Sequence, residues 1–196
     1  VFATSPSDLR TGTRPAQWPQ TGGAGVSVRL PVRQPFAADA VMGFIGARAI
    51  PGIETWDGTS YRRSLHLPGG PGVVSIVAHA DHVDARFDLT TWTDLSAAVQ
   101  RIRRLLDLDN DPEASDAVLS EDSVLAGLVA AVPGRRAPAS VDPFETAVRA
   151  IIGQQVSVAG ARTVAARIVA AIGVPVAATS NDPAIDPVGT GVSHLF

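Results

Sequence analysis

The feature that most constrains this chain is a change of hydrophobic period part-way along it. Apolar residues fall at every second position in the segment 82–89, where Val83, Ala85, Phe87 and Leu89 alternate with polar residues. This spacing is typical of a strand with one buried face. From residue 107 onward the alternation is lost, and apolar residues recur at helical spacing. A chain that forms strands first and helices afterwards is expected to belong to the α+β class.

Short turns separate the predicted strands, so the sheet is expected to be antiparallel. The turn at residues 68–72, PGGPG, is an example. One face of the strand that precedes this turn is expected to carry Tyr61, Arg63, Leu65 and Leu67. The predicted strands cover residues 27–30, 59–67, 73–78 and 82–89.

Helical spacing and capping residues define the remaining elements. Thr93, Asp142 and Ser157 are suitable N-caps, and Glu145 is placed to close a capping box with Asp142. The tail from residue 174 to residue 196 is expected to be a loop. The predicted helices cover residues 37–50, 93–106, 111–119, 122–132, 142–152 and 157–172.

Composition excludes several classes of protein. The chain has no cysteine, so disulfides and thiolate metal sites are excluded. Hydrophobic residues make up 45% of the sequence, enough for a packed core. No segment approaches the roughly 20 apolar residues that span a bilayer, so we expect a cytoplasmic protein without a membrane partner. The net charge of −3 argues against a general nucleic-acid binder, which usually carries a basic surface.

Two patterns resemble metal sites, and neither is expected to bind an ion. Residues 107–111, DLDND, begin like a calcium loop, but Pro112 stands where the loop needs glycine and Val118 where it needs glutamate. His79 and His82 are three residues apart, and on a strand this odd spacing directs them to opposite faces. Only a turn at residues 80–81 would bring them together. We therefore expect no metal and no cofactor.

Three segments carry a resemblance to a known family. They are residues 42–65, 104–112 and 133–169, the last of which contains VDPFETAVRAIIGQQVSVAGARTVAARIV. In this order and spacing they resemble the AlkA family of 3-methyladenine DNA glycosylases. In addition, VFATSPSDLR at residues 1–10 resembles the end of an AraC-type helix-turn-helix domain.

The resemblance implies a division of the chain and a function. It implies the tail of an AraC-type domain at 1–10, a linker at 11–26, an AlkA N-terminal α+β domain at 27–106 and part of an all-helical helix-hairpin-helix glycosylase domain at 107–196. In the family, an alkylated purine is flipped out of double-stranded DNA and its N-glycosidic bond is hydrolysed. The implied partner is therefore DNA with alkylated bases, bound by a full-length protein that acts as a monomer.

The resemblance also implies site residues. The helix break formed by Gln154, Gln155, Val156 and Ser157 matches the loop that the family inserts into the minor groove. Gln155 would there fill the gap left by the flipped base. Phe44 matches an aromatic residue of the base pocket, and Arg48, on the same helix face, is expected to support it.

Other family features match nothing in the chain. The glycine hairpin and the catalytic aspartate would lie beyond Phe196, so we expect this stretch alone to lack glycosylase activity. Without partner helices, apolar residues of the last two helices are expected to be partly uncovered, namely Val148, Ile151, Val164 and Ile168. The alternative is a non-catalytic DNA-binding or sensing module of an AraC-type regulator.

Overall fold

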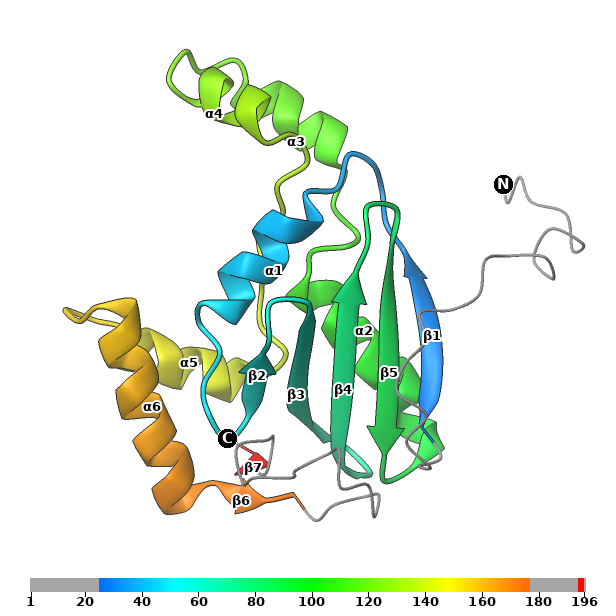
Figure 1. The fold of residues 1–196 in the computed structure, drawn as a ribbon, viewed down its shortest axis with the longest axis vertical. Helices are drawn as coiled ribbons and strands as arrows, with labels where there is room; N and C mark the ends of the chain where they lie inside the picture. Colours follow the sequence, from blue (N-terminus) through cyan, green and yellow to red (C-terminus); the bar gives the residue numbers. More distant parts are fainter. Residues whose placement is uncertain (1–24, 177–193, 196) are drawn as a thin grey trace, which may run out of the picture.

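A five-stranded antiparallel sheet is the centre of the fold (Figure 1). The computed structural model describes residues 25–176 and 194–195. The strand order is β1-β5-β4-β3-β2, so β1, the first strand in sequence, pairs with β5, the last of the five in sequence. Apart from α1, which lies between β1 and β2, the helices follow the sheet in sequence, and the predicted α+β class is confirmed. The strands are β1 (Val26–Pro31), β2 (Glu54–Trp56), β3 (Ser60–Leu67), β4 (Gly70–Ala78) and β5 (His82–Leu89).

The helices form three groups around this sheet. Two of them, α1 (Ala38–Gly46) and α2 (Leu95–Leu105), pack on the sheet, and the 3₁₀ turn η1 (Trp92–Asp94) leads into α2. Figure 1 shows α3 (Pro112–Leu119) and α4 (Leu125–Ala131) projecting away from the sheet. The last two helices, α5 (Pro143–Ile152) and α6 (Val158–Ile172), lie beyond the β2 edge.

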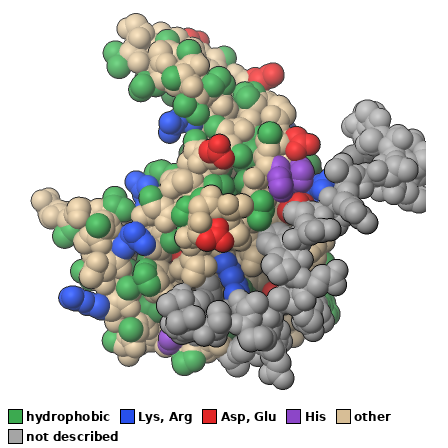
Figure 2. All heavy atoms as spheres, viewed as in Figure 1, with side chains coloured by type: hydrophobic (Ala, Val, Ile, Leu, Met, Phe, Trp, Pro, Cys, Tyr) green, Lys and Arg blue, Asp and Glu red, His purple; other side chains and the backbone are tan. Residues whose placement is uncertain are grey.

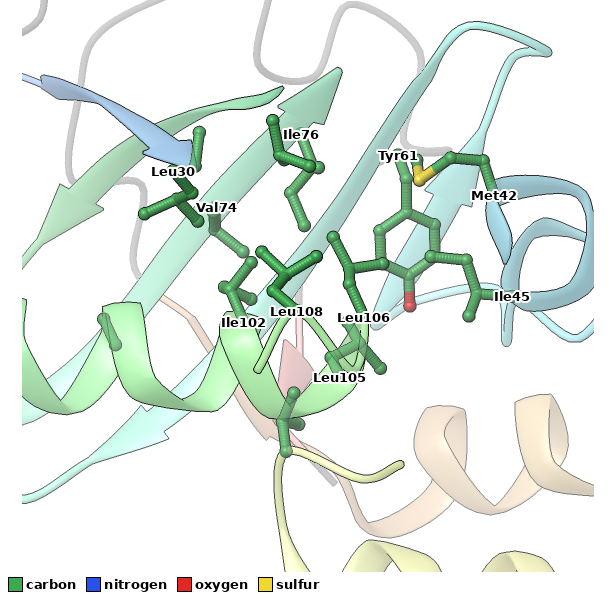
Figure 3. Packing of buried hydrophobic residues seen from close by; sticks show 14 of the residues in the cluster. Leu30, Met42, Ile45, Tyr61, Val74, Ile76, Ile102, Leu105, Leu106 and Leu108 are labelled. Carbon is green, nitrogen blue, oxygen red and sulfur yellow. The ribbon is translucent and has the colours of Figure 1, made fainter. Parts of the chain in front are cut away.

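The main core lies between the sheet and helices α1 and α2 (Figure 3). The alternating side chains of β5 supply Val83, Ala85 and Phe87, each fully buried. Ile102 of α2 packs against them, and burying such a side chain contributes about 1.5–3 kcal/mol. Leu108, beyond the end of α2, is buried in the same cluster. The predicted period-two pattern therefore identified the buried face of β5.

A second, smaller apolar cluster attaches α6 to the sheet side of the molecule. Ile50 and Ile53, in the loop after α1, are buried against Ala165 and Val169 of α6. The main core does not include these residues. The position of α6 therefore depends on the loop between α1 and β2.

Two helix starts differ from the prediction. Thr93 is not an N-cap: it lies within η1, and Asp94 precedes α2, its carboxylate accepting a hydrogen bond from the Gly69 amide at 2.8 Å. The helix predicted from residue 122 begins at Leu125, because the Asp122 carboxylate accepts from the amides that follow it. The two aspartates thus differ: Asp122 binds amides at the start of its own helix, whereas Asp94 binds the distant amide of Gly69.

The first helix and the tail also differ from the prediction. Helix α1 ends at Gly46 rather than at residue 50, because the Arg48 and Ala49 amides bond carbonyls three residues back, which tightens the turn. The tail is not all loop: β6 (Val174–Pro175) pairs with β7 (His194–Leu195). Strand β2 was not predicted, since three residues are too few to show a period.

Some expectations fall on residues that the structure does not describe. The segment 1–10 and most of the segment 11–26 lie outside the described residues. Within the described part, no helix combines the length and apolar character needed to cross a membrane.

The core predicts a contrast between two leucines. Leu106 is fully buried at the end of α2, whereas the Leu128 side chain in α4 is 64% exposed. Leu106→Ala should lower the free energy of unfolding by about 2–5 kcal/mol because it leaves a cavity. Leu128→Ala, the same chemical change, should alter it by less than about 0.5 kcal/mol. Urea unfolding measures both, and equal losses would contradict this placement of the core.

Candidate functional site

An exposed bend joins α5 to α6. Helix α5 ends at Ile152, α6 begins at Val158, and residues 153–157 between them are exposed. The Ser157 hydroxyl accepts a hydrogen bond from the Gly160 amide at 3.1 Å, so the predicted N-cap of α6 is confirmed. The segment is a break between two helices, as the sequence predicted, and the sheet does not cover it.

The backbone of this bend is strained at one residue. Gln155 has a φ of 63°, in the left-handed region. A residue with a Cβ atom pays roughly 1 kcal/mol or more for this conformation, which glycine adopts freely. The strained residue, Gln155, thus carries its amide side chain at the tip of an exposed bend. Backbone strain of this kind clusters at functional sites.

After Glu145, the charged residues of α5 and α6 are all arginines. Residues 146–176 include Arg149, Arg162 and Arg167 and no acidic residue, although the whole chain has a net charge of −3. Figure 2 shows blue arginine groups along the side of the molecule that α5 and α6 form. The chain therefore combines an acidic average with a locally basic surface, which the net charge alone concealed.

Two arginines connect α5 and α6, through hydrogen bonds, to backbone carbonyls at the end of α1. Arg149 of α5 donates a hydrogen bond to the Arg48 carbonyl at 3.2 Å, and Arg162 of α6 donates to the Ala49 carbonyl at 2.8 Å. Carbonyls at the C-terminal end of a helix carry partial negative charge, which favours cations there. The bend between α5 and α6 is therefore held relative to α1.

A cavity of about 520 Å³ opens between α1, β3 and α5. Phe44, which is 44% exposed, and Arg48 both line it. The Arg48 guanidinium lies 3.7 Å from the centroid of the Phe44 ring and donates to the Phe44 carbonyl at 3.2 Å. Phe44 is therefore not a core residue, and its ring is available at the cavity. The roles implied for Phe44 and Arg48 stay predictions.

A smaller cavity of about 200 Å³ lies on the other side of the same arginines. Gly153 and Val156 of the bend line it, together with Ala161 of α6. Arg48 and Arg149 line both cavities. Val156, one of the predicted bend residues, is thus partly turned toward this smaller cavity.

Four charged residues meet at the floor of the larger cavity, and we call them the buried charge cluster: Glu54, Arg63, Glu145 and Arg149. Arg63 on β3 contacts Glu54 at 3.1 Å and Glu145 at 2.7 Å. Arg149 contacts Glu54 at 2.6 Å and Glu145 at 2.7 Å. Each arginine thus bridges the same two carboxylates, and the formal charges sum to zero.

The cluster favours the ionised form of the Glu54 carboxylate. Burial alone would raise the pKa of Glu54, but Arg63 and Arg149 outweigh burial and hold that pKa below its usual value. Glu54 also accepts hydrogen bonds from the Tyr61 hydroxyl and the Ile50 amide. Burial, followed by the negative charge of Glu54, raises the pKa of Tyr61 well above its ordinary value. The cluster therefore holds β2, β3 and α5 together, and each of its two carboxylates is engaged by both arginines.

Sequence reasoning missed the cluster and misread one of its members. Asp142 caps α5 as predicted, accepting from the Phe144 and Glu145 amides. Glu145 does not close a capping box, because its carboxylate binds Arg63 and Arg149 instead. One signal was available: Arg63 is a charged residue on the apolar face of a predicted strand, and such a residue needs a buried partner.

The two histidines at the β4–β5 turn also differ from the prediction. His79 follows β4 and His82 begins β5, so the turn at residues 80–81 folds one back on the other. Their rings are stacked, with centroids 4.4 Å apart. The expectation that they lie on opposite faces is wrong, because they do not belong to one continuous strand.

The expected uncovering of apolar residues on α5 and α6 is observed. Ile151 is 69% exposed and Val164 is 41% exposed. Val148 and Ile168 are half-buried. These helices therefore present apolar as well as basic surface.

Comparisons with known proteins found a matching family model and several similar proteins. The AlkA N-terminal domain model matches residues 27–142. A Mycobacterium tuberculosis protein, named as a probable bifunctional transcriptional activator/DNA repair enzyme AlkA, is 47% identical over 173 residues, which are 88% of this chain and 35% of that protein. DNA-3-methyladenine glycosylase 2 of Escherichia coli is 35% identical over 136 residues, which are 68% of this chain and 46% of that protein. The chain thus spans between a third and a half of these relatives.

Solved structures share the fold. The 3-methyladenine DNA-glycosylase from Archaeoglobus fulgidus superposes with a TM-score of 0.66 at 24% identity, over 76% of this chain and 52% of that one. MBOgg1, in complex with a low-affinity DNA ligand, gives a TM-score of 0.56 at 23% identity, over 79% of this chain and 48% of that one. At these identities the likeness concerns the fold.

The buried charge cluster predicts a large effect of a small substitution. Glu145→Gln keeps the size of the side chain but leaves Arg63 and Arg149 with one carboxylate between them. Removing one partner of a buried pair costs about 3–5 kcal/mol, and we expect a loss of this size in urea unfolding. The control is Glu113→Gln, also in the first turn of a helix but exposed. A Glu145→Gln protein as stable as its control would show that the cluster does not hold α5.

Proposed function

We infer the function from the premise that this chain belongs to the AlkA N-terminal domain family. We propose that it forms the sheet domain and the first DNA-contacting helices of a glycosylase that removes alkylated purines from double-stranded DNA. The observation that carries the proposal is the exposed bend between α5 and α6, with strained Gln155 at its tip and Arg162 and Arg167 on the helix that follows it. The names and activities of the relatives support this assignment.

The bend has the physical properties that a minor-groove plug requires. DNA phosphates attract positively charged surface, and Arg162 and Arg167 on α6 supply such charge beside the bend. A residue inserted between base pairs must project from a backbone that does not give way, and Arg149 and Arg162 hold the two helices against α1. Gln155 fills space and offers amide groups to the base left without a partner. Gln154, Val156 and Ser157 would lie along the same groove.

The larger cavity is suited to part of the base pocket. Its volume of about 520 Å³ is within the usual range for small-ligand sites. Alkylated purines carry positive charge, and an aromatic face attracts a cation. Arg48 covers one face of the Phe44 ring, so the base would stack on the other face. In this proposal Arg48 fixes the Phe44 ring rather than contacting the base.

The direct test is release of the base. The whole protein that contains these residues should liberate 3-methyladenine from an alkylated duplex, measured by chromatography of the free base, and should leave an unmodified duplex intact. Binding of both duplexes without base release would overturn the glycosylase proposal and favour a non-catalytic DNA-binding module.

A substitution in the bend separates DNA contact from folding. Gln155→Gly removes the side chain but suits the left-handed backbone, so the free energy of unfolding should stay the same or rise by up to about 1 kcal/mol. Affinity for a duplex with an abasic site should fall roughly fivefold to tenfold, the equivalent of losing about 1 kcal/mol of contact. Fluorescence anisotropy measures the affinity.

The matched control is Gln100→Ala, which removes an exposed amide from α2. It should leave the affinity for the abasic duplex unchanged. If Gln155→Gly bound this duplex as tightly as the control, Gln155 would not be the plug.

A further inference from the structure

Three side chains of types that can bind metals lie close together at the turn between β4 and β5. His79 Nε2 lies 3.3 Å from Asp84 Oδ2, and His82 Nε2 lies 3.6 Å from the same oxygen. All three donor atoms lie within 4.8 Å of one another. The two histidine rings are stacked, and Figure 2 shows histidine atoms, in purple, on the surface at this end of the sheet. The group is remote in sequence from the bend and the charge cluster.

These donor atoms are buried and unsatisfied. His79 Nε2, His82 Nε2 and Asp84 Oδ2 have no hydrogen-bond partner among the described residues. The Asp84 side chain is 8% exposed and that of His82 is 16% exposed. Buried polar atoms are normally hydrogen-bonded. Three buried atoms without such a bond, all pointing to one place, therefore indicate a bound group that accepts their lone pairs. A cation is such an occupant.

We propose that His79, His82 and Asp84 bind a zinc ion. Zinc takes imidazole nitrogen and carboxylate oxygen at about 2.0–2.1 Å in a tetrahedron, which places neighbouring donors about 3.3–3.4 Å apart. The distances of 3.3 and 3.6 Å from Asp84 to the two histidines are close to this value. Calcium and magnesium prefer oxygen donors, so two imidazoles disfavour them. Water supplies the fourth ligand.

The neighbours of the three ligands orient them for this role. Asp81 Oδ1 lies 2.7 Å from His82 Nδ1, which places the ring proton on Nδ1 and the lone pair on Nε2. Arg29 donates to Asp84 Oδ1 at 3.4 Å, leaving Oδ2 for the ion. A carboxylate behind a ligating histidine is a common partner of zinc ligands.

The backbone of the turn is fixed as well. The His79 amide donates to the His82 carbonyl at 2.8 Å, and the Gln34 side chain donates to the Ala80 carbonyl at 2.8 Å. The two rings are inclined by only 18°, so ligation requires the rings to splay. The His79 side chain is 36% exposed and has room to rotate. Only the position of that ring must change.

The test is titration of the untagged, chelator-treated chain with zinc chloride by isothermal calorimetry. We expect one zinc ion per chain and a thermal unfolding midpoint that rises with zinc concentration. His79→Ala should abolish this binding and the shift of the midpoint. Asp81→Asn, a change at an exposed side chain that leaves all three ligands, should weaken zinc binding about tenfold to a hundredfold.

The control is His66→Ala, which removes an exposed histidine of β3 outside the group. It should bind zinc as the unmodified chain does. Three results would overturn the proposal: no zinc binding, equal binding by His79→Ala and His66→Ala, or a midpoint shift with magnesium chloride as large as that with zinc. None of these readouts involves DNA, so the outcome is independent of the glycosylase proposal.

Discussion

A carboxylate or guanidinium group that is buried needs an oppositely charged partner. The contact between the sheet and the last two helices depends on that constraint. Arg63 lies on the buried face of β3, 3% exposed, and its charge must be met inside the protein. Glu145, 82 positions later in the chain, meets it, and this contact directs α5 onto the β2 edge of the sheet. Apolar packing alone would allow α5 to slide, whereas paired charges specify one arrangement. The position of the bend follows from that arrangement.

The parts of the fold that were predictable are those encoded by neighbouring residues. The alternation from Val83 to Leu89 gave the bounds and buried face of β5, and Asp142 with Pro143 gave the start of α5. The bend between α5 and α6 was also readable, because a glycine and a capping serine act locally. Strand β2 was not, since three residues carry no period, and its pairing with β3 is what buries Glu54.

The site was less predictable because its contacts join distant segments. No local pattern shows that Glu145 binds Arg63 rather than its own helix start, or that Arg162 reaches the end of α1. The left-handed backbone of Gln155 was equally hidden, since glutamine rarely adopts it. The net charge was a poor guide to nucleic-acid binding for a related reason. It sums the charges of the whole chain, whereas a DNA phosphate interacts with the charges near it. The same limit applies to His79, whose neighbour in space is set by a turn rather than by strand spacing.

Arg48 and Arg149 line both cavities, so these two long side chains form part of the wall between them. The two side chains are not equally firm. Glu54 and Glu145 hold Arg149 from two sides, while among the described residues the Arg48 side chain donates only to the Phe44 carbonyl, four residues earlier. The Arg48 side chain is therefore freer to change its rotamer than the Arg149 side chain. Because the Arg48 side chain lines both cavities, any change of its rotamer alters the shape of both at once.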